Sequence, residues 1–430
     1  MTLGNITGFL PGTHNRKTEI TAGVTTFVTI CYILAVIPAV LAAAGIQKEG
    51  AFTVTAVITA VTTLFASITA RQPYVLGPSL GLNAFFAFTI VSASGYTAEQ
   101  ALTFVMAEAV LFFILVYANI HRYILESIPP SLRNALVAGI GMFISFIGLK
   151  NAGIIVSNPD TLVQAGDISP SFLVGILSIL LSGILIIKGV KGAMFYSIIA
   201  CTLAGIPLGV TDIPEKFEFL SFPTLPSVID LDFGIMTEHP ADTAVIIFTL
   251  LIINVFDALG GMIGVSSHTG DKGKEEEKHV KRAFMVCSAG TLAGSLFGMS
   301  PISVMAESSS GAAAGGRTGM SAAVTGILFI AALFLSPVFM LIPISATTGC
   351  LVIVGVYMIS SVSEIDFKDM SEALPAYITI LSTVLTFSIA EGICFGVITY
   401  VIIKLFTRRF DCLNIPMCIL ALLFLIKEII

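Results

Sequence analysis

The sequence has little charge. Charged residues make up 11% of its 430 residues, whereas a soluble domain carries about 25%. Hydrophobic residues make up 56%, and they come in runs long enough to cross a bilayer core as helices. The net charge of −6 leaves no basic face for nucleic acid. A soluble enzyme, a secreted disulfide scaffold and a nucleic-acid binder are therefore excluded, and the pattern predicts an all-α polytopic membrane protein.

Catalytic and metal-binding motifs are also missing from the sequence. The seven Cys residues are scattered and contain no CxxC pair, which indicates small buried hydrophobic residues. The five His residues fall in loops or at the ends of apolar runs, without metal-ligand spacing. No HExxH, Walker lysine, GxSxG or dinucleotide motif occurs. We therefore expect no enzyme activity, no metal and no cofactor.

Fourteen apolar segments are expected to cross the membrane. No cleavable signal is visible, because the polar stretch Met1–Glu19 precedes the first of them. A last apolar stretch, Ile415–Ile430, is left open as a surface helix, a partial insertion or one more span. The expected spans are Ile20–Ala44, Thr53–Ala70, Tyr74–Val91, Ala98–Ala118, Pro130–Leu149, Pro170–Lys188, Gly192–Val210, Ala241–Ser266, Arg282–Gly298, Pro301–Gly316, Met320–Leu341, Ser345–Ser361, Leu374–Ala390 and Gly392–Phe406.

The loop charges agree with this count. Most of the 21 Lys and Arg residues fall on the same side as the N-terminus, and only Lys48, Lys150 and Lys216 fall on the other. This bias places the N-terminus in the cytoplasm, and it would weaken if one span were missing. The acid-rich loop Thr211–Pro240 falls outside, and the charge run Asp271–Arg282 falls inside as a solvated loop.

The spans divide evenly around the acidic loop. Seven precede it and seven follow it, so the second half is expected to be inverted relative to the first, as in many secondary transporters. The resulting organisation is a first repeat at residues 1–210, an extracytoplasmic linker at 211–240, a second repeat at 241–407 and a hydrophobic segment at 408–430.

The third and tenth spans carry helix-breaking residues at matching positions. Gly77-Pro78 interrupts the third span, and Ser300-Pro301 interrupts the tenth, with Gly311 further on. Two short, interrupted apolar segments of this kind indicate the binding site of a transporter. Both spans are therefore expected to be broken helices that line a cavity.

Polar residues inside the apolar runs are the candidate site residues. A carboxylate at the bilayer centre costs roughly 2.5–3.5 kcal/mol on insertion scales, so Asp257 and Glu307 each need a reason to be there. Asn83 lies in the broken third span, where capping a helix end is the alternative role. Asn254 shares a helix face with Asp257 and is expected to line the same cavity or to orient its carboxylate.

Other polar and aromatic residues are weaker candidates. We expect Glu108 at a lipid-facing or bundle-edge position and Glu391 at the membrane interface. Phe residues are common, so packing is their default role, yet a ring near the site is suited to stacking on a flat ligand. Phe85 and Phe256, which lie close in sequence to Asn83 and Asp257, are included in the candidate site for that reason.

Several motifs together resemble the AzgA-like purine permeases, the adenine/guanine/hypoxanthine branch of the nucleobase–cation symporters. They occur in order along nearly the whole chain. They are TEITAGVTTFVTICYILAVIPAVLAAAG in the first span, GPSLGLNAFFAFTIV in the third, VFDALGGMIGV in the eighth, AESSSGAAAGGRTGMSAAV in the tenth and eleventh, and LTFSIAEGICFGVITY in the last two.

The resemblance implies a fold and a function. The fold would have a core domain of spans 1–4 and 8–11 and a gate domain of spans 5–7 and 12–14. The function would be proton-coupled uptake of a purine base by alternating access, with Asp257 and Glu307 contacting the base and Asn83 beside them. As a separate hypothesis, enclosure in low dielectric without a cation partner favours Asp257 as the proton carrier, with Glu307 as the alternative. The partners would be the base, protons and the lipid bilayer; the oligomeric state, a homodimer included, stays open.

This chain departs from the family pattern around the presumed pocket. Ser79-Leu80 replaces Gly-Met, and Asn254 stands where an acid is frequent. Ala258 and Gly261 replace two threonines. These changes leave the substrate open, and xanthine, uracil or an organic anion are the alternatives, although acids in the pocket disfavour an anion. An intramembrane enzyme lacks a supporting motif, and a passive channel would be recognised by the absence of accumulation.

Overall fold

The computed structural model describes residues 7–9, 14–119, 128–214, 217–226, 228–269, 274–414, 417–418, 420–422 and 424–425. Within these ranges, nine helices are long and apolar enough to cross a membrane. Three shorter apolar helices, Leu80–Ala93, Ala193–Gly205 and Met370–Leu385, match further expected spans. The chain is therefore a mostly helical, multi-pass membrane protein, while the count of fourteen spans stays a prediction.

The first half alternates long helices with one broken segment. Cys31 and Tyr32 separate the first two helices, and a capping box of Thr97 and Gln100 begins α6. The elements are α2 (Arg16–Ile30), α3 (Ile33–Ala42), α4 (Lys48–Thr69), β1 (Leu76–Pro78), α5 (Leu80–Ala84), the π-helix η1 (Phe85–Ala93), α6 (Ala98–Tyr117), α8 (Pro130–Asn151), β2 (Ile155–Asn158), β3 (Leu162–Ala165), α9 (Pro170–Ile187) and α10 (Ala193–Gly205).

The second half also interrupts its helices with one short buried strand, β4. Side chains of Thr318, Asp369 and Ser388 cap the starts of α15, α18 and α19. The elements are α11 (Ile235–Glu238), α12 (Pro240–Thr269), α13 (Lys274–Ser295), β4 (Ile302–Val304), α14 (Ser308–Ala313), α15 (Gly319–Ala332), η2 (Leu333–Leu335), α16 (Ser336–Met340), η3 (Ile344–Thr347), α17 (Thr348–Ile359), η4 (Ser360–Glu364), α18 (Met370–Leu385), α19 (Ile389–Phe406) and η5 (Phe410–Cys412).

Some expectations fall wholly or partly outside the described residues. These include parts of the stretches Met1–Glu19, Asp271–Arg282 and Ile415–Ile430, and the residues Lys216, Lys272 and Lys427. The membrane position of Ile415–Ile430 therefore remains open.

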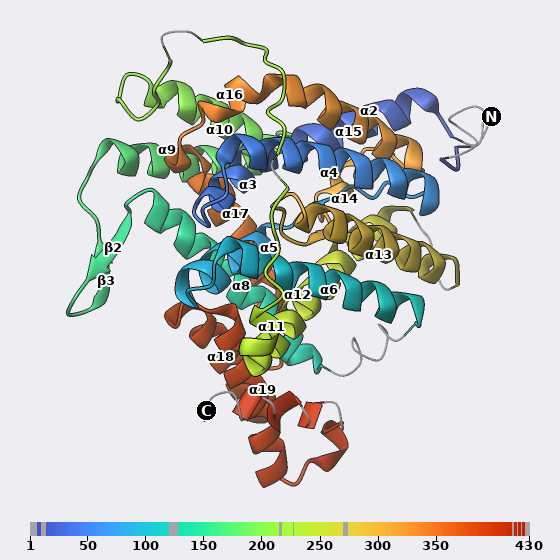
Figure 1. The fold of residues 1–430 in the computed structure, drawn as a ribbon, viewed down its shortest axis with the longest axis vertical. Coiled ribbons are helices and arrows are strands. Elements are labelled where there is room, and N and C mark those ends of the chain that lie inside the picture. The colour runs from blue at the N-terminus through green and yellow to red at the C-terminus, as the bar shows by residue number, and fades with distance from the viewer. Residues whose placement is uncertain are drawn as a thin grey trace.

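Several helix pairs bring the first half of the chain against the second. α4 packs against α15, and α6 packs against α13. α8 packs against both α17 and α18. In Figure 1, α18 and α19 lie at one end of the molecule near the C-terminus, and the β2–β3 hairpin projects from the side.

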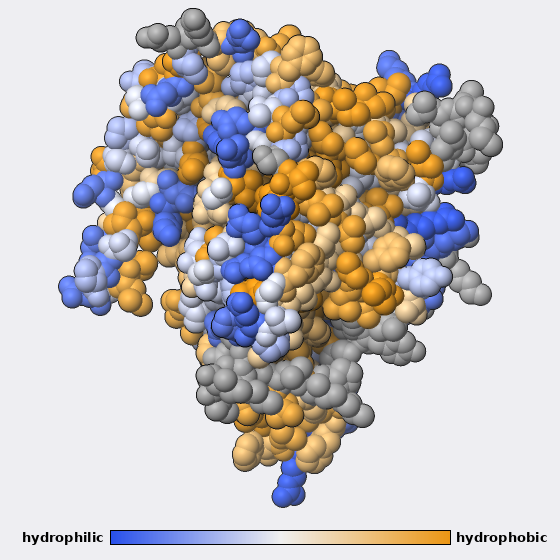
Figure 2. All heavy atoms as spheres, in the orientation of Figure 1, coloured by the Kyte–Doolittle hydropathy of each residue, from blue (hydrophilic) through white to orange (hydrophobic). Residues whose placement is uncertain are grey.

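The surface has a broad apolar part and polar edges (Figure 2). Large hydrophobic side chains that are exposed include Phe65 on α4, Ile114 on α6 and Leu180 on α9. An exposed apolar surface of this extent fits contact with lipid rather than with water. The acid-rich segment before α12 exposes the acids Asp230, Asp232 and Glu238 together with apolar side chains such as Phe222.

Candidate functional site

Two short strands meet where the third and tenth expected spans are interrupted. β1 and β4 pair antiparallel, with Leu76 opposite Val304, Gly77 opposite Ser303 and Pro78 opposite Ile302. Both strands are completely buried, and each is followed closely by a short helix, α5 or α14. Extended backbone at such depth needs partners on both of its edges, because unpaired N–H and C=O groups are costly there.

Threonine side chains satisfy the outer edges of both strands. On α4, the Thr63 hydroxyl accepts from the Leu76 N–H (3.0 Å) and donates to the Leu76 carbonyl (3.1 Å). On α13, the Thr291 hydroxyl accepts from the Ile302 N–H (2.9 Å). The helix that precedes each strand thus anchors it through a threonine, in the same way in both halves of the chain.

Asp257 lies on α12 beside this strand pair. The helix comes so close to β4 that a Cβ at Gly261 would lie 2.2 Å from the Val304 carbonyl oxygen. The hydroxyls of Ser303 on β4 and of Ser79, which follows β1, face the Asp257 carboxyl group. Asp257 as a whole residue is partly exposed.

Glu307 lies at the other end of the strand pair, directly before α14. It is partly exposed, and its Oε1 accepts a hydrogen bond of 2.5 Å from the hydroxyl of Tyr32. Tyr32 is fully buried at the break between α2 and α3. Asp257 and Tyr357 of α17 are also close enough to Glu307 to interact with it electrostatically. The structure therefore brings the two predicted acids to one place.

Asn83 is buried on α5 and is only half satisfied. Its Nδ2 donates to the Ser79 carbonyl (2.7 Å), which holds the first turn of α5. Its Oδ1 has no partner among the described residues. The residue therefore supports the helix start and also offers a free acceptor.

Asn254 and Glu108 form a buried pair. The Asn254 Nδ2 donates to Glu108 Oε1 (3.2 Å), so the amide contacts Glu108 and no bond from it to Asp257 is seen. The expectation that Glu108 lies at a lipid-facing or bundle-edge position is wrong, because its exposed fraction is 0%. α6 is apolar on all faces, and lipid and the protein interior favour the same residue types. The sequence therefore does not indicate which face of α6 is buried in the protein.

The two candidate aromatic residues differ in exposure. Phe85 is fully buried in the apolar core. Phe256 is partly exposed, and the Arg133 guanidinium of α8 lies over its ring, 5.4 Å from the ring centre. Phe256 is therefore the ring that reaches the boundary between α12 and α8.

The GGRTG motif has a structural role. Arg317 Nη1 donates to the carbonyls of Ala312 (2.5 Å) and Gly316 (2.8 Å), which closes the C-terminal end of α14. The Arg317 N–H donates to the Glu19 carboxylate on α2 (2.9 Å). These contacts hold α14, and with it Glu307, against the first helix.

Sequence reasoning missed three polar residues of this region. Tyr32 sits within an apolar run where packing is the default interpretation, and its partner is far away in the sequence. Ser79 and Ser303 lie in the interrupted segments. Their hydroxyl groups, next to a Pro/Gly break, are the feature by which the sequence could have identified them as site residues. No group of His, Cys, Asp and Glu suited to a metal ion occurs among the residues that the structure describes.

Comparisons with known proteins agree on one family. Residues 17–395 match the model of the Permease family. A putative permease of Methanocaldococcus jannaschii is 39% identical over 96% of this chain and 95% of its own length. The adenine permease AdeP of Escherichia coli is 37% identical (96% and 92% covered), and the guanine/hypoxanthine permease PbuO of Bacillus subtilis is 37% identical (96% of each).

A solved structure shows the same fold. The transmembrane domain of the cyanobacterial bicarbonate transporter BicA superposes with a TM-score of 0.68 at 18% identity, covering 89% of this chain and 98% of that domain. At this identity the likeness concerns the fold alone.

Proposed function

The chain belongs to the permease family, within its AzgA-like purine branch, and from this premise we propose that it takes up a purine nucleobase by proton symport. Members of this family are transporters and not enzymes. Adenine, guanine and hypoxanthine are the proposed substrates, because similar permeases carry those names. The carrying observation is the β1–β4 pair, beside which Asp257 and Glu307 interact.

The proposed architecture is fourteen spans in a 7+7 inverted repeat. Its support is the equivalent anchoring of β1 by Thr63 and of β4 by Thr291. The inverted symmetry would relate span 2 to span 9 and span 4 to span 11. It would therefore relate the contact of α4 (span 2) with α15 (span 11) to the contact of α13 (span 9) with α6 (span 4). The domain limits are those of the sequence: 1–210, 211–240, 241–407 and 408–430, in the cell (inner/plasma) membrane, with a cytoplasmic N-terminus.

Recognition of the base is proposed to use Glu307 and the groups around it. A purine edge carries N–H donors beside acceptors, and a carboxylate accepts two N–H groups side by side with charge-assisted strength. Tyr32 occupies only one of the lone-pair sites of Glu307, so others remain for the base. Asn83 offers its free Oδ1, and Phe256 offers a partly exposed ring. Asn254 and Phe85, which are both buried, complete the proposed set.

Asp257 is proposed as the proton carrier. Its carboxyl group lies near two serine hydroxyls and Glu307. The Arg133 guanidinium lies over the ring of the preceding residue, Phe256. Protonation removes the cost of moving a carboxylate through low dielectric. One proton that enters with the base adds about 2.3 kcal/mol per 100 mV of membrane potential. The roles of Asp257 and Glu307 are exchangeable in this scheme.

Alternating access is proposed to move the core domain against the gate domain. The strand pair and its flanking helices α5 and α14 would travel with the base, because both belong to the proposed core. An organic-anion substrate is disfavoured because two carboxyl groups flank the site and would repel an anion.

Uptake of radiolabelled adenine, guanine, hypoxanthine, xanthine and uracil tests the proposal in cells without their own permeases. We expect protonophore-sensitive accumulation of at least one purine. Asp257→Asn and Glu307→Gln should abolish accumulation with the protein still in the membrane, whereas Asp212→Asn in the exposed linker should not. Full accumulation by either site variant would remove that residue from the scheme, and accumulation of none of the five would reject a nucleobase substrate.

A further inference from the structure

Glu108 is a fully buried acid that the proposed transport scheme does not use. It lies near the middle of α6, with an exposed fraction of 0%, among apolar neighbours. An ionised carboxylate in such a place needs a cation or several donors, and it is otherwise more stable when it binds a proton. Within the described residues, its hydrogen-bond partner is the neutral amide of Asn254.

The hydrogen bonds of this pair are incomplete in one specific way. Asn254 Nδ2 donates to Glu108 Oε1, while Glu108 Oε2 and Asn254 Oδ1 both lack a partner within the described residues. Both of these oxygens are acceptors when the acid is ionised. One proton on Oε2 supplies the missing donor, since a carboxylic acid and a primary amide are complementary, each donating once and accepting once.

The surroundings connect Glu108 with Asp257. Asn254 and Asp257 are one turn apart on α12, and the thiol of Cys287 on α13 lies close to both carboxyl groups. The third neighbour, η1, contains no titratable residue. Lys281 of α13 is the cation that contacts α6 within the described residues, and it donates to the Tyr117 carbonyl, nine residues or about 13 Å further along the helix.

We propose that Glu108 is a second proton-binding residue of the transport site, paired with Asn254 and coupled to Asp257. This rests on proton-coupled uptake as the proposed function. Oε2 gains an O–H bond when it takes up a proton, and that bond breaks on release, with the electron pair left on the oxygen. Because α6 and α12 both belong to the proposed core, the pair would carry its proton along with the base.

The test separates coupling from folding. In liposomes that contain the purified full-length protein, Glu108→Gln should lower purine accumulation driven by a pH gradient at least tenfold. It should leave purine counterflow, which needs no net proton movement, within about twofold of wild type. Glu99→Gln, an exposed acid on the first turn of the same helix, is the matched control and should change neither activity.

Infrared difference spectra across a pH step give an independent readout. We expect a carbonyl band of a protonated carboxylic acid that disappears in Glu108→Gln and shifts in Asn254→Ala. Gradient-driven accumulation by Glu108→Gln at the wild-type level and with the wild-type pH profile overturns the inference, as does the absence of the band.

Two further outcomes remain decisive. If Glu108→Gln is not monodisperse, Glu108→Asp replaces it, and a shifted pH profile supports the inference whereas an unshifted one rejects it. If the wild type shows no gradient-driven accumulation of any purine, the proposed function fails on its own. The infrared band still decides whether Glu108 binds a proton.

Discussion

At the scale of single residues, the strongest contact at the site joins Tyr32 to Glu307. The hydroxyl donates to the carboxylate over 2.5 Å from a completely buried ring. A hydrogen bond to a charged group contributes about 1.5–3 kcal/mol. Tyr32 therefore fixes the orientation of the acid that we assign to base recognition, and its hydroxyl limits how the carboxylate can turn toward the base.

Tyr32→Phe should raise the KM for the purine by about tenfold, because about 1.4 kcal/mol corresponds to a factor of ten. The ring, and with it the packing between α2 and α3, is retained. Initial uptake rates over a range of base concentrations measure the effect. Tyr377→Phe, which removes an exposed hydroxyl on α18, is the control. An unchanged KM in Tyr32→Phe would mean that the Glu307 carboxylate does not depend on this hydrogen bond.

Much of the site at this scale followed from the sequence. Asp257 and Glu307 stood out because an acid in an apolar run is costly, and both lie beside the strand pair. Tyr32 was not singled out, and Glu108 was expected at a lipid-facing or bundle-edge position. Their partners are distant in the sequence, and a hydropathy pattern does not say which neighbour a buried polar group meets. Non-local pairing of this kind becomes visible only in three dimensions.

At the scale of elements, Phe387 links three segments of the chain. It lies in the turn between α18 and α19, with a left-handed φ of 55° that is unusual for a bulky residue. Its ring packs against Phe143 on α8 (centroids 5.0 Å apart) and against Phe88 on η1 (6.3 Å). η1 belongs to the proposed core and the other two segments to the proposed gate. Alternating access should therefore break the contact with Phe88 and keep the contact with Phe143.

Short thiol crosslinkers test this asymmetry. In a background with Cys412→Ser and Cys418→Ser, the remaining native cysteines are buried. Phe88→Cys with Phe387→Cys, once crosslinked, should bind the base but lose at least nine tenths of its accumulation. Phe143→Cys with Phe387→Cys should keep its activity after crosslinking. Transport by the first crosslinked pair at the uncrosslinked rate would contradict a motion between these elements.

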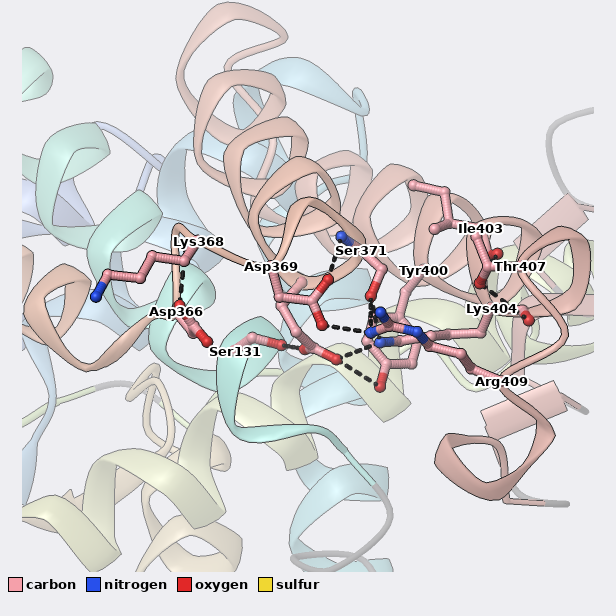
Figure 3. A network of polar contacts seen from close by, with 11 residues as sticks. Ser131, Asp366, Lys368, Asp369, Ser371, Tyr400, Ile403, Lys404, Thr407 and Arg409 are labelled. Atoms are coloured by element: carbon pink, nitrogen blue, oxygen red, sulfur yellow. Dashed lines mark hydrogen bonds and ion pairs between the residues drawn. The ribbon is translucent and has the colours of Figure 1, made fainter.

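A polar network holds the start of α18 against the end of α19 (Figure 3). Lys404 is almost fully buried and pairs with Glu372 (2.5 Å), while Arg409 forms an ion pair with Asp369. The Ser371 backbone N–H, followed by Arg409 and the Ser371 hydroxyl, lowers the pKa of Asp369 to about 2. A buried cation with a close carboxylate fixes how two elements meet, because breaking the pair leaves a charge without compensation.

The network should make stability depend on acid pH. Because the folded-state pKa of Asp369 is lowered from about 3.9, its contribution is complete above about pH 4 to 5 and is lost as the pH falls through about 2. Asp369→Asn keeps the helix cap and removes the charge. Its melting temperature should lie below that of wild type at neutral pH, and the difference should vanish near pH 2. Asp366→Asn, an exposed neighbour, is the control; a pH-independent difference for Asp369→Asn would exclude the charge as the cause.

The sequence predicted the elements unevenly. Long apolar runs such as Pro130–Leu149 and Ala241–Ser266 correspond closely to α8 and α12. Pro301–Gly316, expected as a broken span, contains a three-residue strand and a six-residue helix. Proline and glycine indicated the interruption. The pairing of β4 with β1 could not be predicted in this way, because β1 lies more than 200 residues away in the sequence. The β2–β3 hairpin was not expected, because its strands, IVSN and LVQA, are only four residues long and lie between two long apolar segments.

At the scale of the whole molecule, the proposed inversion of the second half predicts on which side of the membrane each loop lies. If the proposed fourteen spans are correct, nine of them separate the β2–β3 hairpin from the residues after α19. An odd number places these two regions on opposite sides of the membrane, and the distribution of Lys and Arg places the C-terminal side in the cytoplasm. A missing or additional span between them would bring both regions to the same side.

Cysteine labelling with a membrane-impermeant reagent decides between these cases. Cys412 is exposed after α19, and Cys418→Ser leaves it as the reactive thiol, since the other five are buried. We expect no labelling of Cys412 in intact cells and full labelling in inside-out vesicles. In a Cys412→Ser, Cys418→Ser background, Asp160→Cys in the exposed hairpin turn should give the reverse result. Labelling of both positions from one side would reject the inverted repeat, because two inverted halves need an equal and odd number of spans, which leaves an odd number between the hairpin and Cys412.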